Sequence, residues 1–146
     1  MKTEYSETID NRFIKFIKKH HVLTLATSVN DLSWCCSCFY VYDEIENRFI
    51  FSSDTDTKHI QNAIINPNVS ANIYLETKII GNIQGIQVTG LLKQLNGEIE
   101  TIARKIYLKK FPFAILINTS LWAIYANTLK LTDNKLGFGK KLIWQK

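Results

Sequence analysis

Three consecutive segments are predicted to be strands joined by short turns, and this series constrains the fold more than any other feature. The first, Val22 to Val29, ends at the turn signal Asn30-Asp31, and the second, Leu32 to Asp43, is long and alternating. A turn over Glu44 to Asn47 leads into the third, Arg48 to Ser53. Turns this short join antiparallel strands. In the second segment, alternation places one set of side chains on a common face: Trp34, Cys36, Cys38, Tyr40 and Tyr42.

Three more strands are predicted in the rest of the chain, at Val69 to Leu75, Ile83 to Leu95 and Leu121 to Asp133. The second of these contains Gly85 and Gly90, and glycine inside a strand often marks a bulge or a close approach of backbone. Six strands with few helices predict a mainly β protein with flanking helices, built around a small antiparallel barrel.

Three helices are predicted beside these strands. The first ends near His20-His21, the second runs from about Lys58 to Asn66 and is closed by Pro67, and the third covers Gly97 to Lys110. Apolar residues recur at helical spacing in the first and third. These positions are Ile9, Phe13, Phe16, Ile17 and His20 in the first helix, and Ile99, Ile102, Ala103, Ile106 and Tyr107 in the third.

Length and composition are typical of one soluble domain, which we expect to cover residues 1–146. The chain has 46% hydrophobic and 21% charged residues. No apolar segment approaches the ~20 residues of a membrane span, and the N-terminus lacks the apolar core of a signal peptide. We therefore expect a cytoplasmic protein without membrane contact. The net charge of +5 is dispersed over helix faces and ends, so nucleic-acid binding is not expected.

The three cysteines, Cys35, Cys36 and Cys38, form one local cluster with an odd number of thiols. Such a cluster is not a disulfide framework and suits a reducing compartment. In a strand only Cys36 and Cys38 share a face, and a structural zinc site requires four ligands. The sequence alone therefore favours packed, reduced cysteines and no metal.

The end of the third strand carries the clearest candidate site. Its apolar run, Phe49 to Phe51, is followed by hydroxyl groups and then by a cationic pair where a helix begins. A helix start presents unpaired backbone N–H groups and the positive end of the helix dipole, which favour an anion such as phosphate. The alternative is an ordinary capped helix with a solvated lysine. The side chains close enough to complete an anion site are Ser52, Ser53, Thr57, Lys58 and His59.

Several segments together are typical of one family. They are Phe39 to Asp43 with Phe49 to Ser53, the helix leading to Asn66-Pro67, Ala103 to Lys105 with Phe111-Pro112, and Leu136 to Trp144. Through them nearly the whole chain resembles the pyridoxamine 5'-phosphate oxidase-like FMN-binding split barrels, in particular the bacterial YhbP-type branch. The resemblance implies a six-stranded antiparallel split β-barrel and a homodimer, with each flavin in the groove between the subunits.

The resemblance also implies roles for individual residues. In split-barrel relatives a Thr/Ser pair and a Ser-Arg-Lys triplet hold the FMN phosphate, and Ser52-Ser53 and Thr57-Lys58-His59 stand in those places. Gln87 lies beside Gly85, which occupies the place of a flavin-contacting Gln. Lys140 is a candidate cation to compensate for charge that the chain lacks relative to the oxidases. Trp122 is expected in the core or at the dimer interface, as is Trp144, and its flat ring is also a candidate flavin-stacking partner.

Besides Gly85, the chain departs from the oxidases at two places. Cys35 and Tyr40 replace a phosphate-binding Arg and Lys on the second strand, and a C-terminal Arg-x-His that recognises pyridoxal phosphate is absent. We therefore expect weaker FMN binding than in the oxidases and no pyridoxine-phosphate oxidase activity.

The function predicted from these features is that of an FMN-binding oxidoreductase or flavin reductase-like protein with an unknown small substrate. No Ser-His-Asp spacing, P-loop or paired-carboxylate pattern indicates another chemistry. The alternative is a non-catalytic module of the same fold that binds a flavin, haem or another phosphorylated ligand. His20-His21 offers haem ligands, although its place at a helix end favours a capping role.

Overall fold

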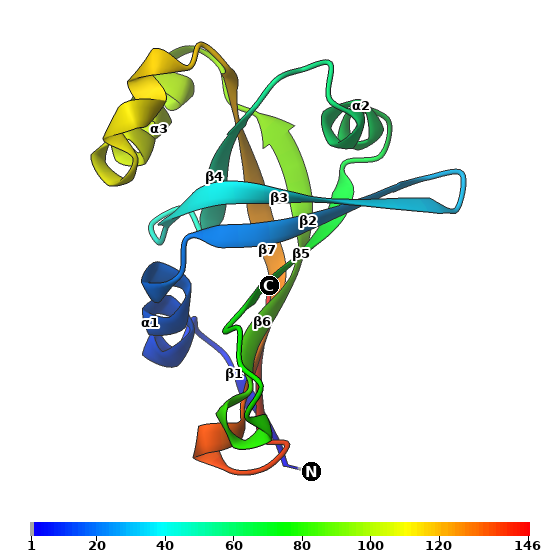
Figure 1. The fold of residues 1–146 in the computed structure, drawn as a ribbon, viewed down its shortest axis with the longest axis vertical. Helices are drawn as coiled ribbons and strands as arrows, with labels where there is room; N and C mark the ends of the chain where they lie inside the picture. The colour runs from blue at the N-terminus through cyan, green and yellow to red at the C-terminus, as the bar shows by residue number, and fades with distance from the viewer. Residues whose placement is uncertain (1) are drawn as a thin grey trace.

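The computed structural model describes residues 2–146, and within them eight strands form one sheet. Six of these strands close into an antiparallel barrel in the order β7-β4-β3-β2-β5-β6, because β6 also pairs with β7 (Figure 1). This confirms the predicted fold. The elements are β1 (Thr3–Ser6), α1 (Asn11–Lys19), β2 (Val22–Val29), β3 (Leu32–Asp43), β4 (Arg48–Ser53), α2 (Lys58–Ile65), β5 (Asn68–Tyr74), η1 (Ile80–Asn82), β6 (Gln84–Gln94), α3 (Gly97–Lys110), η2 (Pro112–Leu116), β7 (Ser120–Asp133), η3 (Asn134–Leu136) and β8 (Lys141–Gln145).

The first two turns set the register of the barrel. Asn30 and Asp31 both adopt positive φ, 52° and 62°, as a two-residue hairpin loop requires, and Val29 consequently pairs with Leu32. Asn47 also has positive φ, 49°, just before β4. Asn and Asp tolerate this conformation better than other side chains do. The bounds of β2, β3 and β4 are therefore those that the sequence predicts.

The interior of the barrel is filled by the inward faces of its strands. On β3 the predicted face is confirmed, because Cys38, Tyr40 and Tyr42 are buried and Cys36 is half-buried. Trp34 on the same face is exposed, because the end of the β2–β3 hairpin projects from the barrel beneath α2 (Figure 1). The largest fully buried side chains include Phe13, Leu23, Leu25, Tyr40, Phe49, Phe51, Ile60, Ile73 and Ile86.

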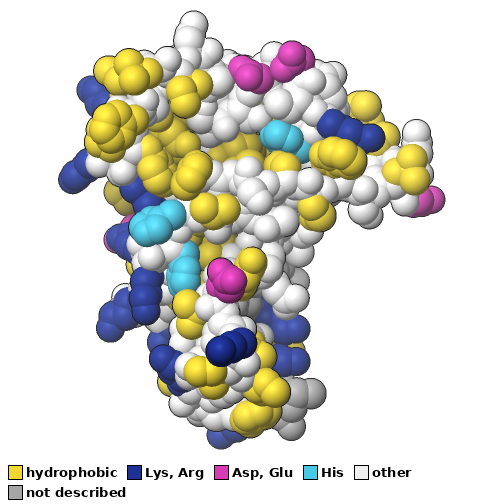
Figure 2. Space-filling model, viewed as in Figure 1, with side chains coloured by type: hydrophobic (Ala, Val, Ile, Leu, Met, Phe, Trp, Pro, Cys, Tyr) yellow, Lys and Arg dark blue, Asp and Glu magenta, His cyan; other side chains and the backbone are white. Residues whose placement is uncertain are grey.

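The helices cover the barrel at separate places. α1 buries Phe13 and Ile17, and α2 buries Ile60 and Ala63. In α3 the predicted apolar stripe is only partly covered, since Ala103 and Tyr107 are buried whereas Ile99 and Ile102 are exposed. Hydrophobic side chains accordingly show on the surface over the region of α3 (Figure 2). No helix among the described residues is both long and apolar enough to cross a membrane.

Two short strands lie outside the six predicted ones. The apolar tail around Trp144 forms β8, which pairs antiparallel with the last part of β7, and β1 pairs parallel to β8. The expectation at Gly90 is confirmed, because the β6–β7 register shifts between Thr89 and Gly90. A Cβ atom added at Gly90 would lie 2.3 Å from the Tyr125 carbonyl oxygen, so glycine permits the close approach of these strands.

Candidate functional site

The predicted anion site lies at the corner between β4 and α2. Thr57 occupies the N-cap position of α2, but its side chain makes no capping hydrogen bond to the helix. Its hydroxyl donates instead to the Asp54 carbonyl oxygen, at 2.9 Å. The first N–H groups of a helix have no partner within the helix, and here the N-cap side chain does not supply one. The corner therefore has the backbone arrangement that favours an anion.

Three polar side chains meet at this corner. His59 Nε2 lies 2.7 Å from Ser53 Oγ and 3.3 Å from Thr57 Oγ1, and the two hydroxyl oxygens are themselves 3.3 Å apart. Burial lowers the pKa of His59, which favours the neutral imidazole. The cluster therefore offers neutral hydrogen-bonding groups, and any positive charge at the corner comes from the neighbouring Lys58.

Lys58 is directed toward the projecting β2–β3 hairpin. Its Nζ lies 4.7 Å from the centre of the Trp34 ring, which is a cation–π contact. Trp34 was not among the predicted site residues, and the sequence held no local signal for it, because the contact depends on how α2 packs over β3.

Ser52 and Trp122 lie away from this cluster. Side chains alternate along a strand, so Ser52 points to the other face of β4, where its hydroxyl bonds the Thr119 hydroxyl. Trp122 is 3% exposed, and its indole N–H donates to the Ser53 carbonyl oxygen at 3.1 Å. Ser52 and Ser53 therefore do not act as a pair, and Trp122 supports the end of β4 from within the core.

Gln87 lies on the outer face of the barrel, in a hollow of about 490 Å³. Cys35 lines the same hollow, whereas Tyr40 is buried and donates to the Ile17 carbonyl oxygen. The second-strand positions at which the resemblance implied phosphate-binding cations thus supply none at the α2 corner. A cation that sequence reasoning missed, Lys130, lines the hollow because β7 pairs it with Gln87.

Lys140 lies at the opposite end of the molecule from α2, in the loop between η3 and β8 (Figure 1). It lines a small groove together with charged residues of the N-terminal segment, Glu4 and Arg12. The predicted cofactor-binding residues therefore do not form one site within the chain. Four lie at the α2 corner, whereas Gln87 lies in the outer hollow, Lys140 at the η3 end, Trp122 in the core and Ser52 on the other face of β4.

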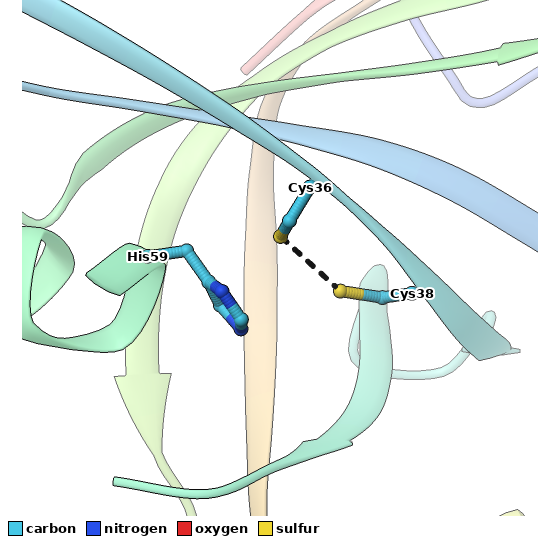
Figure 3. A group of neighbouring side chains, drawn as sticks. All are labelled: Cys36, Cys38 and His59. Atoms are coloured by element: carbon cyan, nitrogen blue, oxygen red, sulfur yellow. Dashed lines mark hydrogen bonds between the residues drawn. The ribbon is translucent and has the colours of Figure 1, made fainter. Parts of the chain in front are cut away.

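Cys36 and Cys38 face His59 across the space between β3 and α2 (Figure 3). Their sulfur atoms are 3.7 Å apart, and the potential ligand atoms of all three side chains lie within 4.8 Å of one another. The sulfur–sulfur hydrogen bond and burial raise the pKa of Cys38, and the same hydrogen bond lowers the pKa of Cys36. The shared face of the two cysteines was predicted, but their proximity to His59 was not.

The fold of the chain is that of split-barrel proteins of known structure. A haem-binding protein from Mycobacterium smegmatis superposes with a TM-score of 0.75 at 16% identity, over 89% of this chain and 55% of that protein, so the chain spans about half its length. A FAD-binding protein from Mesorhizobium loti gives 0.69 at 14% identity, over 84% and 92% of the two chains. A putative pyridoxamine 5'-phosphate oxidase from Listeria innocua gives 0.69 at 12% identity, over 85% and 98%.

Sequence similarity defines the family more narrowly. The chain is 39% identical over 132 residues to a UPF0306 protein of Photorhabdus laumondii, covering 90% of this chain and 92% of the relative. A UPF0306 protein of Yersinia pestis is 37% identical over 132 residues, with 90% of each chain covered. The chain belongs to the UPF0306 family. No protein-family model matches it.

Proposed function

We propose that the protein binds FMN, with the phosphate at the start of α2 and the ring in a groove between two copies of the chain, and that it acts as a flavin-dependent oxidoreductase on a small substrate. The observation that carries the proposal is the cluster of Ser53, Thr57 and His59 beside the start of α2. Neighbours of the same fold that are named as FAD-binding and as a putative pyridoxamine 5'-phosphate oxidase support a flavin.

The residues at the corner fit a phosphate, although with less charge than the oxidases provide. Two hydroxyls, one imidazole and the first N–H groups of α2 offer donors, and Lys58 adds one positive charge. Cys35 and Tyr40 occupy the positions of the second-strand Arg and Lys of the oxidases. A hydrogen bond to a charged group contributes about 1.5–3 kcal/mol, so the loss of two weakens binding by a hundredfold or more. We therefore expect FMN to dissociate readily during purification.

Bound flavin supplies the hydride or electron transfer, and the protein supplies binding and orientation. Ser53, Thr57 and Lys58 bind the phosphate, while Gln87 and Lys130 offer polar contacts from the outer hollow. Lys140 lies at the other end of the same subunit, so it reaches a flavin at this corner only from a second copy. The division of these residues among three places thus supports a dimeric site.

The substitution Lys58→Ala tests the phosphate site. Loss of a charge-assisted contact of about 1.5–3 kcal/mol lowers FMN affinity about tenfold to a hundredfold. Lys15→Ala is the matched control, because Lys15 is an exposed lysine on α1 and its removal changes the net charge equally. Riboflavin lacks the phosphate and is expected to bind both variants and the wild type alike. Equal FMN affinity in wild type and Lys58→Ala would contradict the proposal.

A haem-binding function is the second candidate, favoured by the haem-binding neighbour of the same fold. In this structure the His20 ring packs 4.3 Å from the ring of Phe16, and burial lowers its pKa. The His20 ring is thus packed against its own helix at the C-terminal end of α1. Titration of the purified protein with FMN and with hemin, followed by absorption, separates the two ligands. Steady turnover of a reduced nicotinamide in the presence of FMN would support the enzyme over a non-catalytic flavin-binding module.

A further inference from the structure

Two thiols and one imidazole converge between β3 and α2, although they belong to distant parts of the sequence (Figure 3). We propose that Cys36, Cys38 and His59 bind a zinc ion, with a fourth coordination position open to water or to an added ligand. The inference goes beyond the proposed flavin site, with which it shares His59, and it does not depend on flavin binding, because neither cysteine belongs to the phosphate-binding cluster.

The spacing of the sulfur atoms suits zinc. A tetrahedral ion with Zn–S bonds of about 2.3 Å holds two thiolates ~3.8 Å apart, and Cys36 Sγ and Cys38 Sγ are 3.7 Å apart. The two cysteines therefore need no rearrangement. The potential ligand atoms of the three residues lie within 4.8 Å of one another. The His59 imidazole must therefore move toward the two sulfur atoms to bind an ion at a Zn–N distance of about 2.0–2.1 Å. His59 lies at the beginning of α2 and is half-buried, so a tilt of the ring about its hydrogen bond to Ser53 can supply this movement.

The surroundings of His59 orient it as a ligand. Ser53 Oγ lies 2.7 Å from Nε2, so a ring that keeps this hydrogen bond would bind an ion through Nδ1. A metal-binding histidine almost always donates its other N–H to a neighbouring oxygen, which fixes the orientation of the ring. Ser53 is itself held in place, because the Trp122 indole N–H donates to its carbonyl oxygen. Trp122 and Ser53 are thus positioning residues for this site.

Charge and access also suit a divalent ion. Two thiolates and one neutral imidazole balance the charge of Zn²⁺, so the complex is neutral overall. Its partial burial therefore avoids the large free-energy cost of burying a net charge. Burial lowers the pKa of His59, which keeps the imidazole in the form that binds metal. Cys38 is buried, whereas Cys36 is half-buried, so an ion can reach the sulfurs from the side of Cys36.

Cys35 provides a matched control within the same strand. It is exposed on the opposite face of β3 and lines the outer hollow, so it shares residue type and strand with the ligands but not their location. Cys36→Ser removes one ligand at a half-buried position and is expected to leave the fold intact. His59→Gln removes a ligand from the other element. Both variants are checked for native circular dichroism before titration.

The experiment uses the full chain, stripped of metal by a chelator and kept reduced. Zn²⁺ is titrated in competition with a chromophoric chelator, and Co²⁺ serves as a spectroscopic probe. Wild type and Cys35→Ser are expected to bind about one ion per chain, with thiolate-to-cobalt charge-transfer absorption. Cys36→Ser and His59→Gln are expected to lose at least about a hundredfold in zinc affinity, because even a change in a residue that only hydrogen-bonds to a metal ligand costs about 10–100-fold.

The proposal is overturned if Cys36→Ser binds zinc as the wild type does, if Cys35→Ser loses binding instead, or if cobalt produces no thiolate band. FMN titration of Cys36→Ser shows whether the loss of this zinc ligand also affects the flavin site. If FMN affinity is unchanged while zinc affinity falls, Cys36 serves the zinc site alone, and His59 is the residue that the two sites share. If no variant binds FMN but zinc binding follows the expected pattern, the proposed function fails and the zinc site stands.

Discussion

The closure of the barrel between β6 and β7 depends on one glycine, and alanine at Gly90 tests it. An added Cβ would lie 2.3 Å from the Tyr125 carbonyl oxygen and 2.9 Å from Ile124 Cγ2. The nearer atom belongs to the backbone of β7, so no rotation of a side chain relieves the clash. Two other glycines form a graded series with it. At Gly85 the nearest atom, the Ile73 carbonyl oxygen, would be 3.3 Å away, and at Gly81 nothing lies within 4 Å.

The expected magnitude follows from two opposing effects. At a compatible position Gly→Ala stabilises a protein by about 0.4–1 kcal/mol, because it restricts the unfolded chain. None of the three glycines has a positive φ, so the backbone itself permits alanine. At Gly90 the strands must separate, and overpacking of this kind costs about 1–3 kcal/mol or more. A change of 1 kcal/mol shifts the melting temperature by about 2–4 °C in a domain of this size, so we expect a fall of roughly 2–12 °C.

Thermal unfolding of the three variants, with urea unfolding to confirm the order, is the assay. Gly81→Ala is expected to be neutral or slightly stabilised, Gly85→Ala to change little, and Gly90→Ala to lose the most. A Gly90→Ala variant as stable as Gly81→Ala would refute the register described between β6 and β7.

Sedimentation is expected to give a dimer of about twice the 16.9 kDa chain mass. The η2 segment exposes Phe113, Ile115 and Leu116 together, an apolar surface that a second copy would cover. Phe113→Glu should therefore favour the monomer, whereas Tyr5→Glu, also exposed but on β1, should not. A stable wild-type monomer would contradict this. Burial lowers the pKa of His20 and of His59, so the unfolded state binds more protons as the pH falls below about 6.5. The free energy of unfolding should therefore decrease through this range, and a His20→Gln/His59→Gln variant should show a shallower decrease in urea titrations. With excess FMN under air, pyridoxamine 5'-phosphate should not be oxidised, because residues 137–141 lack the Arg-x-His pair; turnover near about one per second would show otherwise.

The parts of the fold that could be predicted depend on local sequence. Asn30 and Asp31 specify a tight turn by their own tolerance of positive φ, so the hairpin they join has its predicted bounds. β1 could not be predicted in this way, because its four residues pair only with β8 at the other end of the chain and remain mostly exposed. The periodicity of α3 predicted the helix but not its burial. Ile99 and Ile102 follow the helical spacing, yet the barrel covers only part of that face.

In the candidate sites, too, local sequence predicted the contacts between neighbouring residues but not those made by the packing of separate elements. Ser53, Thr57 and His59 lie within a few residues of one another, so a strand followed by a helix was sufficient to bring them together. Ser52 was grouped with them by sequence proximity, but strand alternation turns it to the opposite face. The position of Cys36 and Cys38 opposite His59 depends on the packing of α2 against β3, which no local pattern encodes.

The two proposed sites meet at His59, and the two nitrogens of its ring allow both to be occupied. A zinc ion on Nδ1 fixes the proton on Nε2, which then donates either to Ser53 Oγ or to a phosphate oxygen at the corner. Zinc would thereby make His59, which as a neutral imidazole can donate or accept at Nε2, a hydrogen-bond donor at a corner where Lys58 supplies the positive charge. Coupling between two ligands is reciprocal, so zinc must strengthen FMN binding by the same factor by which FMN strengthens zinc binding. Titrations of each ligand with and without the other measure both factors, and the coupling should vanish in Cys36→Ser because that variant loses the ion while retaining the imidazole.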